Sequence, residues 1–143
     1  MDLYCPFFAH MKYLLLTGRF LFSLIFMLTL ASHFKPEMIA HAASKGVPVA
    51  SFLVPFSAII AFAGGCCIVL GYRARIGGLL ILIFLIPVTL FMHAFWSETD
   101  AMMQKMQMAN FMKNVALMGA ALIICYFGSG PLSIDNTQAI KKP

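Results

Sequence analysis

The sequence contains few charged residues. Asp, Glu, Lys and Arg make up 10% of its 143 residues, whereas 62% are hydrophobic and the mean hydropathy is +0.91. A soluble domain carries about 25% charged and roughly 45–50% apolar residues. A globule of this length could not bury so much apolar surface, because small domains leave a large fraction of their surface in contact with water. The composition therefore excludes a soluble enzyme and predicts a single integral membrane domain.

The sequence also lacks a basic stripe and a paired set of cysteines. Its formal net charge is +5, but the basic residues stand singly or in pairs at the ends of apolar runs. That pattern is typical of membrane topology signals and argues against nucleic-acid binding. The four cysteines show no CxxC or zinc-ligand spacing, so neither a redox motif nor a metal site is expected. Cys66 and Cys67 would point about 100° apart on a helix, which prevents a relaxed disulfide between them.

Four apolar runs dominate the rest of the chain. Each approaches the ~20 residues that a helix needs to cross a hydrocarbon core of ~30 Å. They predict an all-α fold, an integral membrane four-helix bundle within residues 13–128. The predicted spans are 13–31, 52–70, 76–95 and 111–127.

The segments between and beyond the spans are more polar. Short interfacial helices are predicted in the two outward connections, at 36–45 and 97–110, and Pro36 suits the first turn of the former. Residues 1–12 form an N-terminal extension, in which Met11 could serve as an alternative start. Residues 129–143 form a polar tail.

The distribution of basic residues predicts the orientation of the spans. The positive-inside rule counts Lys and Arg in short loops and near the ends of the spans. The side that carries both termini has six such residues and the other side has four, and Arg73 and Arg75 lie in the shortest loop. We therefore expect a multi-pass membrane protein with both termini in the cytoplasm. Arg19 lies close enough to that interface for its side chain to snorkel toward it.

Small residues recur on one face of the second span. Ser57, Ala61 and Gly65 are spaced four residues apart, so they share a helix face. Small side chains at this spacing let another helix approach closely in lipid. The spacing predicts a helix–helix contact.

Polar residues gather at the side opposite the termini. His93 and Trp96 share one helix face, and Asn110, Lys113 and Asn114 share another. The two faces could form one ligand-binding pocket, whose hydrogen-bonding groups would suit a quinone head group. Alternatively, the same residues anchor the protein at the interface and tie helices together.

Methionines cluster near the same side. Met102, Met103 and Met106, with His93, are weak candidates for Cu(I), because thioether and imidazole ligands suit that soft ion. Methionine also packs well at a lipid interface. We favour the packing role and expect no metal site.

Seven short motifs, in this order, resemble those of the DoxX family of small bacterial membrane proteins. They are Gly18-Arg19, Gly46-Val47-Pro48, Gly64-Gly65, Gly71-Tyr72-Arg73, His93-Ala94-Phe95-Trp96, Phe111-Met112-Lys113-Asn114 and Gly130-Pro131-Leu132-Ser133-Ile134-Asp135. The resemblance covers residues 13–135 and implies a four-helix protein of the bacterial inner membrane. The family takes its name from a subunit of a thiosulfate:quinone oxidoreductase, and other members are linked to oxidative-stress complexes.

Taken together, the residues and the resemblance favour an accessory, ligand- or quinone-binding subunit of a membrane redox or stress-response complex. Such a subunit would not be an enzyme on its own. One alternative is the catalytic membrane subunit of a quinone-linked oxidoreductase acting on a small sulfur compound, and another is a copper-handling membrane protein. The expected partners are membrane lipids, a membrane or periplasmic redox protein and further copies of this or another subunit.

Overall fold

The structure is a computed structural model that describes the backbone of residues 6–141 and the side chains of residues 11–138. Its elements are helices, and no strand occurs in residues 6–141, so the all-α prediction is confirmed. In chain order they are α1 (Pro6–Leu28), the 3₁₀ helix η1 (Leu30–Phe34), α2 (Pro36–Ser44), α3 (Ala50–Leu70), α4 (Ala74–Met92), the 3₁₀ helix η2 (Phe95–Ser97), α5 (Ala101–Phe127) and α6 (Ile134–Lys141).

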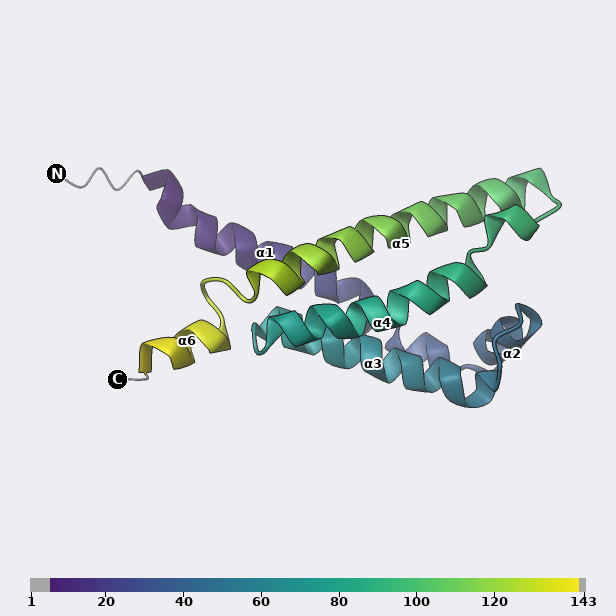
Figure 1. Ribbon diagram of the computed structural model, residues 1–143, viewed down its shortest axis with the longest axis horizontal. Coiled ribbons are helices and arrows are strands. Elements are labelled where there is room, and N and C mark those ends of the chain that lie inside the picture. Colours follow the sequence, from purple (N-terminus) through teal and green to yellow (C-terminus); the bar gives the residue numbers. More distant parts are fainter. Residues whose placement is uncertain (1–5, 142–143) are drawn as a thin grey trace.

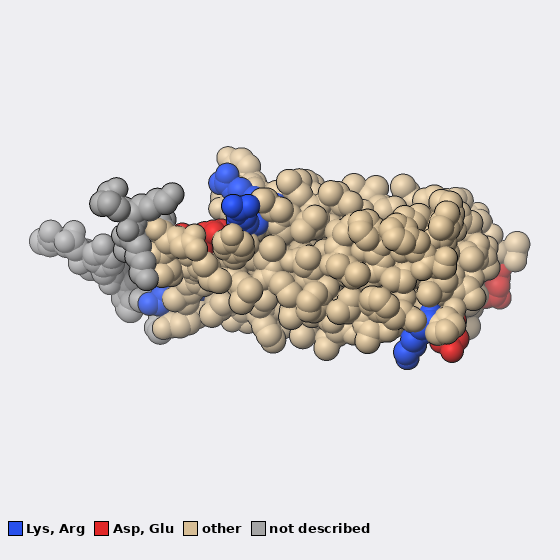
Figure 2. All heavy atoms as spheres, turned by 90° about the horizontal axis from the view of Figure 1, so that it is seen from below, with Lys and Arg blue, Asp and Glu red and all other residues tan. Residues whose placement is uncertain are grey.

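Four helical segments are long and apolar enough to cross a membrane. They run over Met11–Phe34, Ala50–Leu70, Ala74–Ser97 and Ala101–Phe127, and each contains one predicted span. Large apolar side chains are exposed along all four. On the face shown in Figure 2, Lys, Arg, Asp and Glu lie toward the two ends and leave an uncharged belt between them. This pattern confirms an integral membrane helical fold.

The four long helices pack as a row with α3 and α4 in the middle. α1 packs mainly against α3, and α5 packs against α4 (Figure 1). A shared core joins all four helices: Phe26, Ala61, Ile68, Ile81, Phe84, Leu85 and Ala121. The connections place both described ends of the chain, together with the α3–α4 loop, at one end of the molecule.

Glycines bring the central helices into close contact. A Cβ atom at Gly64 of α3 would lie 2.9 Å from the carbonyl oxygen of Gly77 of α4, and one at Gly78 would lie 3.0 Å from that of Ala121 of α5. Neither distance leaves room for a side chain. Helix association in lipid depends on such close packing, because lipid gives no hydrophobic drive between helices.

The predicted small-residue face contacts α1 over part of its length. Ala61 is buried, and Gly65 lies against α1, where a Cβ atom would be 3.5 Å from the carbonyl oxygen of Ser23. Ser57 is half-buried and lines a cavity instead.

Of the two helices predicted in the outward connections, the first agrees with the structure and the second does not. α2 occupies Pro36–Ser44, with the proline at its start as expected. Residues 101–110, however, are not a separate interfacial helix but the first turns of α5, which is 27 residues long. Asp100 starts this helix, because its carboxylate accepts a hydrogen bond from the backbone nitrogen of Met103 at 2.8 Å. No proline interrupts the helix afterwards, so it continues through the polar residues into the span.

Candidate functional site

We call the end of the molecule with α2, η2 and the start of α5 the histidine end. It contains a cavity of about 490 Å³, the histidine-end cavity. α2 closes one side, because its Ala42 packs on Ala50 and Val54 of α3. Most of the wall is apolar, and the polar residues that line it come from η1, α2, α3, the end of α4 and α5: His33, His41, Ser57, His93, Gln107 and Asn110.

His93 is held in place by a neighbouring helix. Its Nδ1 lies 2.8 Å from Oε1 of Gln107, a side chain that is only 7% exposed. An amide oxygen can only accept, so Nδ1 of His93 donates this hydrogen bond. In the neutral imidazole Nε2 is then an acceptor, and it has no hydrogen-bond partner among the described residues.

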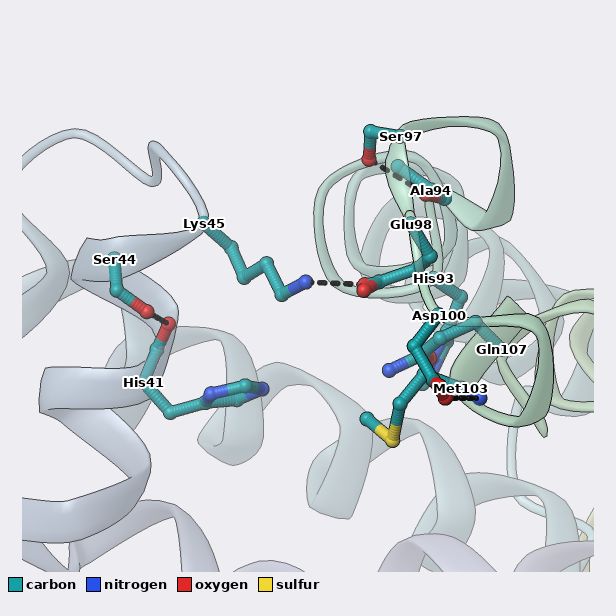
Figure 3. A network of polar contacts seen from close by, with 10 residues as sticks. All are labelled: His41, Ser44, Lys45, His93, Ala94, Ser97, Glu98, Asp100, Met103 and Gln107. Carbon is teal, nitrogen blue, oxygen red and sulfur yellow. Dashed lines mark hydrogen bonds and ion pairs between the residues drawn. The ribbon is translucent and has the colours of Figure 1, made fainter.

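His33 and His41 approach the cavity from other segments. His33 is hydrogen-bonded through Nδ1 to the carbonyl oxygen of Thr29 at 2.8 Å, and its ring packs edge-on to Phe84. His41 is exposed on α2, and its side chain extends toward the start of α5 (Figure 3). Three imidazoles therefore border one cavity, although no group of three His, Cys, Asp or Glu side chains is close enough to hold a metal within the described part of the chain.

An ion pair joins two segments beside the cavity. Nζ of Lys45, just after α2, lies 2.5 Å from Oε1 of Glu98 in the α4–α5 connection (Figure 3). The two side chains are 26% and 17% exposed. The pair thus links α2 to the segment that leads into α5, while neutralising both charges.

The structure brings only two of the five predicted pocket residues to the cavity, namely His93 and Asn110. Lys113 is exposed and donates to Oδ1 of Asn110 at 3.2 Å. Trp96 is 57% exposed and packs edge-on against Phe111.

Asn114 instead ties two helices together. Its side chain is 5% exposed, and Nδ2 donates to Oγ1 of Thr89 at 3.1 Å. Thr89 in turn donates to the carbonyl oxygen of Leu85, so α5 is hydrogen-bonded to α4 inside the span. Hydrogen bonds of this kind are worth on average about 0.6 kcal/mol between helices in lipid.

The residues that sequence reasoning missed at this cavity are His33, His41 and Gln107. Both histidines lie between the first two predicted spans, but nothing local indicated that α2 folds back over α3. The methionines Met102, Met103 and Met106 lie on α5 with exposed side chains and do not line the cavity.

The opposite end, which carries the α3–α4 loop and residues 128–138, we call the terminal end. Here Arg19 is only 5% exposed. Its side chain does not snorkel to the surface, contrary to the prediction from the sequence. Its Nη1 donates to the carbonyl oxygen of Ser129 at 2.7 Å, and its Nη2 donates to that of Leu132 at 2.5 Å. Arg19 therefore fastens the segment after α5 to the first span.

Asp135 fastens the same segment to the α3–α4 loop. Its carboxylate accepts hydrogen bonds from Oγ of Ser129 at 2.5 Å and from the backbone nitrogen of Arg73 at 2.9 Å. These two hydrogen bonds, the one from Ser129 above all, hold the pKa of Asp135 below its ordinary value. The backbone nitrogen of Asp135 also donates to the carbonyl oxygen of Gly71. A carboxylate from the tail thus caps the first turn of α4.

Comparison with known proteins corrects the family assignment. The sequence model of the SURF4 family matches residues 8–141, almost the whole chain. The chain is also 29% identical over 99 residues to the inner membrane protein YphA of Escherichia coli strain K12, an alignment that covers 68% of this chain and 69% of YphA. No solved structure matches.

The DoxX resemblance was wrong, since neither comparison points to that family. Its motifs are short combinations of Gly, Pro, Arg and aromatic residues at helix ends and tight loops. Such residues serve any small membrane bundle of this architecture, so they do not separate one family from another. The relative and the four candidate spans support a multi-pass location in the inner membrane. The chain belongs to the SURF4 family.

Proposed function

We propose that the protein binds an amphipathic small molecule from the membrane in the histidine-end cavity. The observation that carries this proposal is the cavity itself, an apolar space of about 490 Å³ bordered by polar groups from five segments. Small-molecule sites have volumes of roughly 300–1,000 Å³, apolar walls and a few convergent polar groups.

The lining residues favour a ligand with a neutral, hydrogen-bonding head group. The unpartnered Nε2 of His93 can accept a hydrogen bond, and Asn110 can both donate and accept. Val54, Val88 and Phe91 supply apolar wall for the rest of the molecule.

The DoxX resemblance was the ground for the predicted role in a redox complex, and that resemblance is wrong. What supports ligand binding is the cavity, which does not depend on that resemblance. The proposal requires that the ligand comes from the surrounding membrane lipids.

The test is native mass spectrometry of the protein purified in mild detergent, with the co-purified molecule identified by its mass. We expect wild-type protein to retain an amphipathic molecule and Ser57→Phe, which fills the cavity, to retain it about tenfold less. Ile83→Phe is the matched control, because Ile83 is 58% exposed on α4 and does not line the cavity. Equal retention by Ser57→Phe and Ile83→Phe, or no ligand in wild-type protein, would refute the proposal. The retained mass also separates a phospholipid from a quinone.

We further propose that both termini face the cytoplasm. The short loop with Arg73 and Arg75 supports this orientation, since positive charges in short loops stay on the cytoplasmic side. Reporter fusions at Tyr72 and Thr99 should report the cytoplasm and the opposite compartment, respectively. The reverse result would invert the orientation.

A further inference from the structure

A second cavity lies at the terminal end, at the opposite end of the molecule from the histidine-end cavity. Its volume is about 530 Å³, and it opens between the start of α4 and the segment that follows α5. Arg73, Arg75, Ser129, Ser133 and Asn136 contribute its polar lining, and Phe127 and Ile76 its apolar edge. We call it the terminal cavity.

Positive charge exceeds negative charge around the terminal cavity. Arg73 and Arg75 line it, so two guanidinium groups face one carboxylate, that of Asp135. Neither arginine forms an ion pair within the described residues. The carboxylate is already engaged by Ser129 and by the backbone of Arg73. An anion would therefore meet a net excess of one positive charge.

Two carbonyl groups of the loop after α5 are already hydrogen-bonded on the side of the loop that faces α1. Arg19 binds the carbonyl oxygens of Ser129 and Leu132 on the α1 side of the loop. The backbone N–H groups of Ser129 and Gly130 have no acceptor among the described residues, so they remain available to an anion.

Arg75 lies directly over the same loop. A Cβ atom at Gly128, where φ is +77°, would be 3.3 Å from Nε of Arg75. The glycine thus leaves room for the guanidinium group, which stays beside the cavity. Exposed apolar residues flank it, since Phe127 is 72% and Ile76 46% exposed at the ends of two spans. An anion bound here would lie next to the lipid.

We propose that the terminal cavity binds the phosphate of an anionic phospholipid, held by Arg73 and Arg75, with the acyl chains along Phe127 and Ile76. Guanidinium groups recognise phosphate through paired hydrogen bonds, and basic pockets beside membrane helices bind anionic head groups. The site is separate from the histidine-end cavity, so it does not depend on the function proposed above.

The experiment is native mass spectrometry of the full chain in detergent micelles supplied with phosphatidylglycerol, phosphatidylcholine or inorganic phosphate. We expect phosphatidylglycerol to be retained at least about tenfold more than phosphatidylcholine. Arg75→Gln should remove this preference. Lys105→Gln should keep it, because it removes the same charge at the other end of the molecule.

A second pair of variants tests the proposal even if Arg75→Gln does not fold. Asn136 is exposed and lines the cavity, so Asn136→Asp adds a repelling charge without disturbing a buried group, and Asn136→Gln is its neutral control. Asn136→Asp should lose the preference and Asn136→Gln should retain it. Equal retention of both lipids by wild-type protein would overturn the proposal, as would an unchanged preference in both Arg75→Gln and Asn136→Asp. Displacement of phosphatidylglycerol by millimolar inorganic phosphate would reassign the cavity to a free anion.

Discussion

The two ends of the molecule are held together in different ways. At the terminal end two charged side chains, Arg19 and Asp135, bind backbone groups of segments that are distant in the sequence. At the histidine end an ion pair, Lys45–Glu98, and one hydrogen bond between His93 and Gln107 border an apolar cavity. The first arrangement uses charged residues to close the fold, whereas the second leaves Nε2 of His93 without a hydrogen-bond partner among the described residues. Unused hydrogen-bonding groups beside an apolar cavity mark the end that can receive a neutral ligand.

The polar contacts at the two ends should therefore contribute differently to the free energy of unfolding. Hydrogen bonds to a charged group contribute about 1.5–3 kcal/mol each, and their loss leaves buried carbonyl groups unpaired. A partly exposed ion pair contributes at most about 1 kcal/mol. Equivalent changes at the two ends should therefore reduce the free energy of unfolding by different amounts.

The largest difference is expected between two loop glycines at opposite ends of the molecule. Gly71 and Gly46 both have positive φ, +64° and +84°. Alanine at either position is strained, at a cost of about 1 kcal/mol. A Cβ atom at Gly71 would also collide with Nη1 of Arg19 and with Ser133, whereas one at Gly46 meets nothing within 4 Å. Gly71→Ala should therefore be about 2 kcal/mol more destabilising than Gly46→Ala, as measured by unfolding in mixed detergent micelles.

Equal destabilisation by the two glycine variants would contradict a closely packed terminal end. It would mean that the segment after α5 moves aside without cost. The terminal end would then not be held more firmly than the histidine end.

An intermediate effect is expected for Asp135→Asn, at about 1 kcal/mol, because the carboxylate caps α4 from the tail. The pKa of Asp135 is lower in the folded protein than its ordinary value of 3.8. Ionised Asp135 therefore stabilises the fold above about pH 3.8, and this contribution is lost as the pH falls through the lowered pKa. Melting temperatures of wild-type protein and Asp135→Asn should differ at pH 7, and the difference should shrink as the pH falls below 3.8. A difference that persists unchanged at pH 3 would show that ionisation of Asp135 plays no part.

The smallest effect is expected for the ion pair at the histidine end. Glu98→Gln should lower the free energy of unfolding by less than about 1 kcal/mol, and less still in high salt. Glu37→Gln is the control, because Glu37 is exposed on α2 and forms no ion pair among the described residues. A loss of several kcal/mol in Glu98→Gln alone would show that this end is as firmly held as the other.

Sequence patterns predicted four long apolar helices but not the residue at which the last one starts. The apolar runs were sufficient for the first three, since a helix in lipid must be apolar over its length. For α5, the polar residues Lys105 and Asn110 suggested a separate segment. They belong to one helix of about 40 Å, whose first turns extend beyond a ~30 Å core.

The candidate site was predicted only in part for a similar reason. His93 and Asn110 were identified because ionisable and polar residues near a span are unusual. Asn114 satisfied the same criterion, yet it binds Thr89 of the next helix and faces no cavity. Helix periodicity assigns residues to a face, but it does not say whether that face meets another helix, a cavity or lipid.

The sequence by itself determined the class of this protein: an all-helical, multi-pass membrane chain with charged residues confined to its ends. Hydropathy is a local property that adds up along each run, so it can be read without knowing any contact. The tertiary structure alone decided the partners of the polar residues. Arg19 binds a carbonyl group 110 residues away, and His41 borders a cavity only because α2 packs back onto α3. Such contacts depend on how helices meet in space, and no local pattern encodes them.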